Sequence, residues 1–260
     1  PLIFTEGAMA IMACTTDRVG GFTDADIENF TQVAAVLAPI AEVFSQKRIS
    51  TAIANAYLGQ RTGQRVLSGQ ITRGNTEKIN AAIMISDIRD WTGLNTRLSE
   101  DEALLMANRY FDILADAVDE NRGELLKFIG DSILAIFPLE GDACSATDVC
   151  EHALSAAQQA VRVARDGELP LGLDFGIGLH FGEVYYGNIG SSTRIDFTVM
   201  GQAVNITARM ESLCRKFNQP ILFSEPFAAE LKQESVQVAE ERVKGYDLPL
   251  KVMTTTTDRR

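Results

Sequence analysis

Two aspartates, Asp87 and Asp131, are the residues whose type and setting most clearly suggest chemistry. Asp87 lies near the end of the apolar segment "AAIMISDI" (81–88), and Asp131 interrupts "KFIGDSILAIFP" (127–138). A carboxylate among isoleucines and leucines is costly to bury unless a cation or hydrogen bonds balance its charge. Two carboxylates at adjacent strand ends would suit Mg²⁺ or Mn²⁺, and two such ions about 3.5–4 Å apart serve in-line phosphoryl displacement. Spacing alone leaves open that each aspartate is only a turn residue or a helix cap.

A second pair, Asn205 and Arg209, lies four residues apart in "VNITARMES", so both side chains share one helix face. An arginine fork beside an amide suits a phosphate, or a sugar hydroxyl together with a phosphate. The alternative is an exposed helix face on which Arg209 pairs with Glu211 or another acid. Lys127 precedes Asp131 by about 13 Å of extended strand. One small ligand group could therefore not touch both.

These residues need a sheet and helices to position them, and the chain from about residue 80 predicts both. Periodicity and turn residues favour strands over 81–88, 124–130, 132–138, 172–182 and 194–201, and helices over 100–123, 147–166 and 202–217. The order strand–helix–strand–strand–helix–strand is the ferredoxin-like split βαβ pattern. We therefore predict an α+β fold, with a palm-like antiparallel sheet backed by helices.

The first 78 residues have a different texture. A strand is expected over 6–17, a turn over 20–24, and a long helix from Asp24 to about Tyr57 with one apolar stripe. Pro39 predicts a kink or a break within that helix. A helix of this kind commonly pairs with a second copy of itself, so a parallel homodimer is expected. The glycine-containing stretch 57–79 reads as a connector, and the chain is expected to begin inside a domain.

Composition limits the classes of function. The formal net charge of −11, without a cluster of lysines or arginines, argues against nucleic acid as a partner. Four cysteines without a CxxC pair, and only two histidines, argue against a zinc site and favour a reducing, cytoplasmic compartment. We expect no membrane span, because no run of 18 consecutive apolar residues occurs. The absence of a GxxxxGK[ST] motif excludes a P-loop nucleotide site.

Three segments in this order, "MISDIRDWT", "KFIGDSILAIF" and "FTVMGQAVNITAR", resemble the catalytic domain of class III nucleotide cyclases, over roughly residues 78–257. The resemblance implies an adenylate cyclase that forms 3′,5′-cyclic AMP and pyrophosphate from ATP. It implies that Asp87 and Asp131, with the carbonyl of Ile88, hold two Mg²⁺ or Mn²⁺ ions per active site. Backbone amides around Trp91 and Thr92 would approach the triphosphate.

The same resemblance gives roles to five further residues. Asn205 would orient the ribose, Arg209 would stabilise charge on the α-phosphate, and Lys244 would reach the terminal phosphates. Lys127 would read adenine together with Thr198, at a position where many adenylyl cyclases have aspartate. A lysine–threonine pair resembles the subgroup often associated with bicarbonate stimulation, which makes bicarbonate a candidate activator.

In this family the metal-binding and base-reading residues meet across a head-to-tail dimer, so a homodimer with two equivalent sites is implied. Two alternatives remain: a guanylyl or dual-specificity cyclase, and a catalytically silent dimer that binds nucleotide and signals by interaction. "DIRDWT" also departs from the family, because Asp90 stands where glycine is common. Asp90 is expected to point away from the phosphates or to pair with Arg89.

The N-terminal region resembles the end of a GAF sensor domain that runs into a signalling helix. The expected division is a sensor remnant over 1–47, a signalling helix and linker over 48–78, and the cyclase domain over 79–260. A plain dimerisation helix is the alternative for the N-terminal part.

Overall fold

The computed structural model describes residues 1–5, 7–141, 144–168, 173–242 and 249–256. The chain divides into two compact units, Pro1–Gly69 and Gln70–Arg260. This division falls inside the segment expected to be the linker, and the assignment of a sensor remnant and a signalling helix stays a prediction.

The N-terminal unit holds two short strands, β1 (Leu2–Ile3) and β2 (Met9–Ala10), and two helices, α1 (Asp24–Leu58) and α2 (Gln60–Leu67). Thr23 begins α1 with a capping box, because its side chain accepts from the Asp26 amide and Asp26 accepts in return. The strand expected over 6–17 is wrong beyond Met9–Ala10, since β1 offers only two residues for pairing. Of the kink or break expected at Pro39, the break is wrong, because α1 continues through this residue, and the kink stays a prediction.

Helix α1 exposes apolar side chains around much of its circumference within its own unit. Val36 and Leu37 are neighbours in sequence, as are Val43 and Phe44, and all four are exposed. The expectation of one apolar stripe is therefore wrong, since adjacent residues point in different directions on a helix. Among the described residues, α1 is also the one helix long and apolar enough to cross a membrane by length and composition. A helix that binds a protein partner can meet the same criterion, so the absence of a span stays a prediction.

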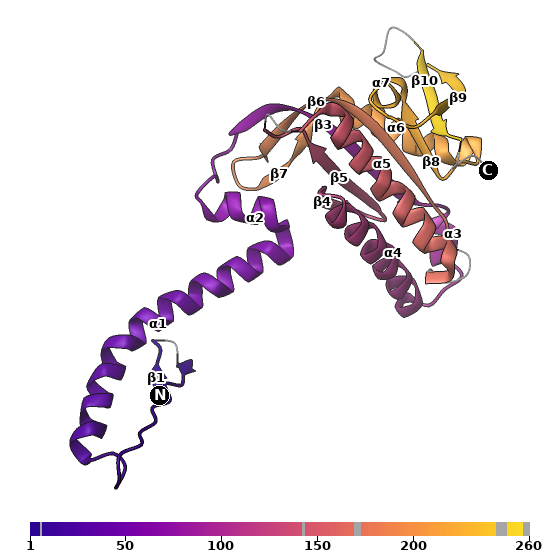
Figure 1. Cartoon of the computed structure of the whole chain (residues 1–260). Helices are drawn as coiled ribbons and strands as arrows, with labels where there is room; N and C mark the ends of the chain where they lie inside the picture. Colours follow the sequence, from indigo (N-terminus) through magenta and orange to yellow (C-terminus); the bar gives the residue numbers. More distant parts are fainter. Residues whose placement is uncertain (6, 142–143, 169–172, 243–248, 257–260) are drawn as a thin grey trace. The chain divides into compact units, whose positions relative to one another are not determined.

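The C-terminal unit follows the expected strand and helix order (Figure 1). Its elements are β3 (Thr76–Ile88), α3 (Trp91–Asn95), α4 (Glu100–Glu120), β4 (Glu124–Ile129), β5 (Ser132–Pro138), α5 (Ala146–Val163), the π-helical turn η1 (Ala164–Glu168), β6 (Phe175–Gly190), β7 (Ile195–Met200), α6 (Gln202–Phe217), β8 (Ile221–Ser224), α7 (Glu225–Ala228), β9 (Ser235–Glu241) and β10 (Leu250–Thr255). The sheet order is β4-β5-β3-β6-β8-β10-β9, and β7 pairs with the far part of β6. Only the β6–β8 pairing among these is parallel. The α+β prediction is confirmed.

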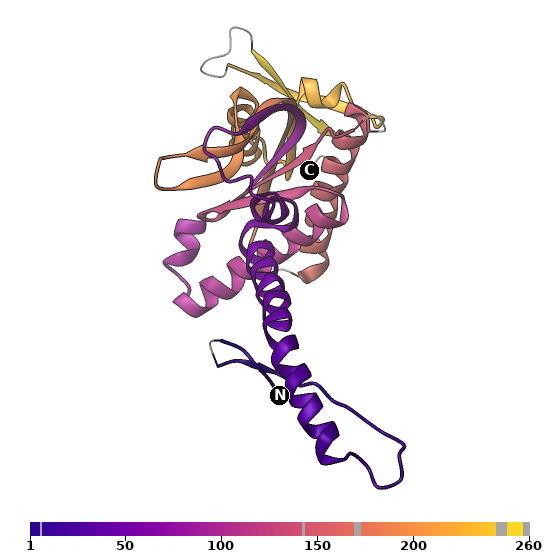
Figure 2. The ribbon, with the colours of Figure 1, turned by 90° about the vertical axis from the view of Figure 1, so that its left-hand side faces the viewer.

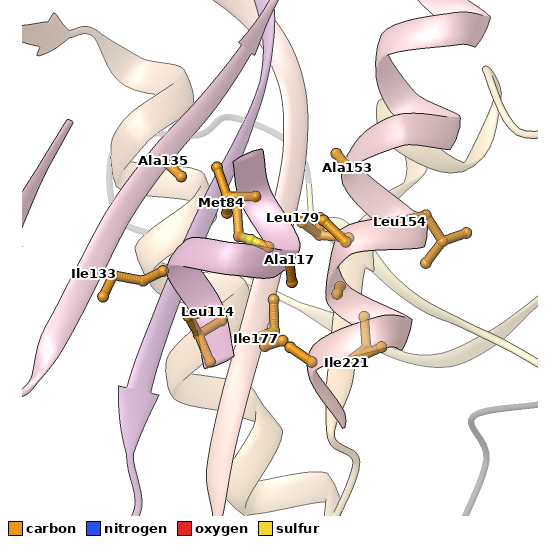
Figure 3. Close-up of a cluster of buried hydrophobic side chains, with 14 of the residues drawn as sticks. Met84, Leu114, Ala117, Ile133, Ala135, Ala153, Leu154, Ile177, Leu179 and Ile221 are labelled. Atoms are coloured by element: carbon orange, nitrogen blue, oxygen red, sulfur yellow. The ribbon is translucent and has the colours of Figure 1, made fainter. Parts of the chain in front are cut away.

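Helices α4 and α5 lie side by side over one face of this sheet (Figures 1 and 2). Their apolar faces meet the alternate residues of the strands, as Figure 3 shows for Met84, Leu114, Ile133, Leu154 and Ile177. All five side chains are at most 5% exposed. This core fixes the direction of β3 and β5, and therefore the place where Asp87 and Asp131 emerge.

Helix α6 covers the opposite face, and glycines in β6 let it approach closely. A Cβ atom at Gly178 would lie 2.3 Å from the backbone nitrogen of Glu211 and 2.5 Å from the carbonyl oxygen of Thr207. No ordinary side chain fits at such distances, because the obstacle is the helix backbone itself. The glycine therefore sets how far α6 stands from the sheet.

A β-bulge in β4 changes which face its later residues occupy. Leu125 pairs with Ala135 and Lys127 pairs with Leu134, so Leu126 is the extra residue. As a result Leu125 packs against the α4–α5 core, whereas Leu126 packs against the cluster on the other face. Lys127 follows on that second face, opposite Leu134.

The substitution Gly178→Ala is expected to lower the stability of the C-terminal unit by about 1–3 kcal/mol, as overpacking of a core does. A matched control is Gly182→Ala in the same strand, where the nearest atoms are side-chain atoms of His180 and Ala203 at 3.1 and 3.2 Å. Thermal denaturation of both variants tests this. Equal melting temperatures for the two variants would contradict the role given to Gly178.

Candidate active site

Asp87 and Asp131 lie close together where β3 ends and β5 begins. Asp87 lies at the end of β3, paired with Ser132 of β5 on one side and with Gly176 of β6 on the other. Asp131 lies in the turn between β4 and β5, which Gly130 closes with a φ of 65°. Ser132 donates its hydroxyl to Oδ1 of Asp87. Both carboxylates are half-buried.

The pair is electrostatically unbalanced. Burial raises the pKa of Asp131, and the nearby charge of Asp87 raises it further. A cation between the two would reverse both effects, because it favours the charged carboxylates. Hard oxygen donors with unbalanced negative charge fit Mg²⁺ or Mn²⁺.

The site offers few protein ligands. Across the part of the chain that the structure describes, no three His, Cys, Asp or Glu side chains are grouped closely enough to hold a metal. Ions bound by Asp87 and Asp131 would therefore need backbone, water or substrate oxygens. The backbone of Ile88, next to Asp87 and 2% exposed, lies at the right place in the chain to supply one.

Glu211 on α6 is a third acid beside this pair, which the sequence analysis considered only as a partner of Arg209. Its Oε1 lies 3.0 Å from the position of a Cβ atom at Gly176, the residue paired with Asp87. Burial, together with the nearby charge of Asp87, raises the pKa of Glu211 to about 7, and the charge of Arg89 opposes this shift. The signal that could have revealed Glu211 is the close approach of α6 to a glycine-containing strand.

The segment after Asp87 is held by two ion pairs. Arg89 Nη1 lies 2.9 Å from Asp174 Oδ2, and its Nη2 donates to the Gln219 carbonyl at 2.7 Å. Asp90 has a φ of 55° and its Oδ2 lies 3.3 Å from Arg97 Nη2. Of the two expectations for Asp90, the pairing with Arg89 is wrong, because Arg89 binds Asp174 and Asp90 binds Arg97. That Asp90 points away from the phosphates stays a prediction.

Trp91 and Thr92 begin the five-residue helix α3 that follows Asp90. Trp91 is half-buried against the α4–α5 core, and Thr92 is exposed. The first amides of a helix have no partner within the helix, and this holds for Trp91 and Thr92 in α3. Contact of these amides with the triphosphate stays a prediction.

Lys127 of β4 and Thr198 of β7 are the two residues predicted to read the base. Lys127 forms an ion pair with Asp196 of β7, and its side chain is 25% exposed. Thr198 is buried, two residues further along β7 and paired with Gly187 of β6. Asp196 had no role in the sequence analysis, because the contact joins strands far apart in the chain.

Asn205 and Arg209 are both exposed on α6 and lie four residues apart on it. Arg209 Nη2 lies 4.0 Å from Glu241 Oε2, at the limit of an ion pair, and Lys216 binds the other oxygen of Glu241. The acid near Arg209 is thus Glu241 rather than Glu211. Lys244 lies outside the described residues.

The predicted site residues therefore lie in two groups. Asp87, Ile88 and Asp131 form the first group, with Trp91 and Thr92 close in sequence, and Lys127 and Thr198 form the second. Along β6, Gly176 beside Asp87 and Gly187 beside Thr198 are separated by about 35 Å of strand. Glu211 faces the first group, whereas Asn205 and Arg209 on the same helix face solvent.

Several curated proteins are similar to this chain in sequence. An adenylate cyclase of Anabaena cylindrica is 30% identical over 207 residues, which cover 75% of this chain and 40% of the relative. The photoactivated adenylate cyclase subunit alpha of Euglena gracilis is 27% identical over 223 residues, covering 85% of this chain and 22% of the relative. The chain thus spans less than half the length of these relatives.

Solved structures share the fold. A bacterial light-regulated adenylyl cyclase has a TM-score of 0.73 at 24% identity, covering 87% of this chain and 66% of its own. The guanylyl cyclase Cya2 has a TM-score of 0.57 at 28% identity, covering 68% of this chain and 92% of its own. Residues 75–255 match the model described as the adenylate and guanylate cyclase catalytic domain. The chain therefore belongs to the family of adenylate and guanylate cyclase catalytic domains.

Proposed function

We propose that the chain is an adenylate cyclase that converts ATP to 3′,5′-cyclic AMP and pyrophosphate in a homodimer. The observation that carries this proposal is the pair of half-buried carboxylates, Asp87 and Asp131, placed together with unbalanced charge. Membership of the cyclase family and the likeness to adenylate cyclases support it further.

In the proposed reaction the ribose 3′-oxygen forms a bond to the α-phosphorus, and the bond from that phosphorus to the bridging oxygen of pyrophosphate breaks. The 3′-hydroxyl proton leaves to solvent. Asp87 and Asp131, with the Ile88 carbonyl, would hold two Mg²⁺ or Mn²⁺ ions, which when bound lower the pKa of the 3′-hydroxyl and offset charge on the phosphates. Asn205 orients the ribose, and Arg209 donates to the α-phosphate oxygens as their charge increases.

Asn205 and Arg209 face solvent, whereas Glu211 on the same helix interacts with Asp87 and Asp131, and this favours a site that a second chain completes. We therefore propose a head-to-tail dimer of catalytic domains. One chain supplies Asp87 and Asp131, and the other supplies Lys127, Thr198, Asn205 and Arg209. The exposed apolar surface of α1 would contribute to the pairing of the two chains.

Base selection is assigned to Lys127 and Thr198. A lysine ammonium donates to the N1 acceptor of adenine, whereas guanine carries a hydrogen at N1 and is better read by an acid. The 28% identity to a guanylyl cyclase keeps a guanylyl or dual-specificity enzyme as the second candidate. The complete set of Asp87, Asp131, Asn205 and Arg209 speaks against a catalytically silent dimer.

The remaining proposals concern regulation and compartment. The N-terminal unit is proposed to be the end of a GAF-like sensor followed by a signalling helix, and bicarbonate is a candidate activator through the lysine–threonine pair. Lys244 is proposed to reach the terminal phosphates, and Trp91 and Thr92 to contact the triphosphate through their amides. A cytoplasmic location is proposed from the free cysteines.

Asp131→Ala is expected to reduce Mn²⁺-dependent cyclic AMP formation by about 10²-fold or more, because it removes a carboxylate from the transition-state charge balance. The dimer should remain intact by size-exclusion chromatography. Asp116→Ala, the same change at an exposed position of α4, is the matched control and should keep the wild-type rate. Unchanged turnover in Asp131→Ala would refute the metal assignment.

Mixing Asp131→Ala chains with Arg209→Ala chains is expected to restore activity that neither variant has alone. With free exchange, half of the dimers are mixed and each has one complete site, so about a quarter of the wild-type rate should return. The measurement is cyclic AMP formation before and after mixing. No recovery, with mixed dimers shown to form, would count against shared sites.

The wild-type chain is expected to turn over ATP at least about tenfold more efficiently than GTP, since Lys127 suits adenine and leaves guanine unpaired. Assays with each nucleotide and Mn²⁺, with and without bicarbonate, measure this. Cyclisation of GTP as fast as ATP would make the guanylyl or dual-specificity candidate the better one.

A further inference from the structure

Ser132 is the first residue of β5, and its side chain differs from all the others in that strand. The six residues that follow it are apolar and buried. Strands favour β-branched and aromatic residues, so strand propensity does not explain a serine at this position. Its hydroxyl instead donates to Oδ1 of Asp87 on β3. The serine therefore serves a contact of the candidate metal site rather than the strand itself.

Asp87 has two direct neighbours across the strands. Ser132 of β5 lies opposite it on one side, and Gly176 of β6 lies opposite it on the other. Side chains at directly opposite positions are close enough to interact. Gly176 has no side chain, so of these two neighbours only Ser132 can hold the Asp87 carboxylate by a side-chain hydrogen bond.

The other groups beside Asp87 include two acids that repel it. Oε1 of Glu211 lies 3.0 Å from the position of a Cβ atom at Gly176, and Asp131 directly precedes Ser132 in the chain. The charge of Asp87 acts on both acids, which shows that the three carboxylates lie near one another. Without the serine hydroxyl, this repulsion would favour orientations of Asp87 that turn away from the other two acids.

The donor itself is held firmly in place. Asp87 and Ser132 form the last pair of a continuous antiparallel register that starts at Ala81 and Pro138. Ile133, the next residue of β5, is fully buried in the core under α4 and α5. The strand therefore fixes where the short serine side chain can place its hydroxyl, and a fixed donor restricts the acceptor that it binds.

We propose that Ser132 is a positioning residue of the metal centre, whose hydroxyl holds the Asp87 carboxylate in the orientation that binds a divalent cation. This inference rests on the proposed function, in which Asp87 and Asp131 bind Mg²⁺ or Mn²⁺. Hydrogen bonds that orient a metal-binding carboxylate are typically worth about 10–100-fold in metal affinity or activity. The turn before β5 thus supplies one metal ligand, Asp131, and with the next residue it orients the other.

The test measures Mn²⁺ binding by the full chain. Electron paramagnetic resonance counts free Mn²⁺ in the presence of adenosine 5′-(α,β-methylene)triphosphate, which cannot release pyrophosphate because carbon replaces the bridging oxygen. A blank without protein corrects for Mn²⁺ held by the nucleotide alone. Ser132→Ala is expected to raise the Kd for Mn²⁺ about tenfold. In steady-state assays, the Mn²⁺ concentration for half-maximal rate should rise similarly, with the rate at saturating Mn²⁺ changed far less.

Three further variants make the result specific. Ser132→Thr keeps the hydroxyl and is expected to bind Mn²⁺ within about twofold of the wild-type affinity. Ser86→Ala is the matched control, because Ser86 directly precedes Asp87 but its hydroxyl accepts from Tyr110 at 2.8 Å. This control is expected to lower the melting temperature and to leave the Kd for Mn²⁺ unchanged. Asp131→Ala gives the reference for a site that has lost one carboxylate.

A wild-type Kd for Mn²⁺ in Ser132→Ala would overturn the inference. So would an equal loss of affinity in Ser132→Thr, or in Ser86→Ala, since the cause would then not be the hydroxyl on Asp87. Wild-type binding no tighter than that of Asp131→Ala would contradict the metal assignment and this inference together. Tight Mn²⁺ binding without cyclic AMP formation would contradict the proposed reaction alone, while the Kd values would still decide the role of Ser132.

Discussion

The repulsion between Asp87 and Asp131 is the constraint on which the rest of the structure depends. Two carboxylates come together at the end of the sheet, and burial raises the pKa of Asp131 where the charge of Asp87 already opposes its ionisation. Such an arrangement persists only because a well-packed core holds both strands in place. The side chains under α4 and α5 are almost fully buried, so β3 and β5 cannot separate to relieve the repulsion. The fold therefore keeps two repelling carboxylates close together, and a bound cation would remove this repulsion.

Helix α6 places some of its polar residues beside the sheet and others in solvent. Gly178 lets the helix backbone approach β6, and this places Glu211 over the acidic end of the sheet. Asn205 and Arg209 point away from it on the exposed side. The same helix can therefore complete the electrostatics of its own chain and offer polar groups to another molecule. Because Gly178 contacts the backbone of α6, a substitution there would shift both Glu211 and the exposed pair Asn205 and Arg209.

Much of the fold could be predicted from local patterns. Helices α4 and α5 start at Ser99 and Ser145, each with a capping box, and their apolar periodicity marks the buried faces. The order of strands and helices then fixed the split βαβ arrangement. The strand expected over 6–17 failed because a strand depends on its partner, and β1 pairs with only two residues. The pairing of Asp90 with Arg89, one of two expectations for this residue, was wrong because the left-handed backbone at Asp90 is not visible in residue types.

In the candidate site too, some residues could be recognised from local sequence and others only from contacts in the fold. Asp87 and Asp131 could be singled out because carboxylates are conspicuous in apolar strands. Glu211 and Asp196 could not, since their importance comes from contacts between elements that are distant in sequence.

The extra residue in β4 carries a consequence for how such sequences are compared. Strand faces alternate, so in a regular strand that kept Leu126 in the pairing, Lys127 would share the face of Leu125, beneath the helices. Because Leu126 is extra, Lys127 lies opposite Leu134 on the other face instead. Loss of Leu126 alone would leave Lys127 opposite Leu134, since the residue lost is the one that the pairing with β5 skips. The face of the lysine is therefore set by its partner on β5 and not by its distance from the start of β4, and relatives should be compared by that pairing.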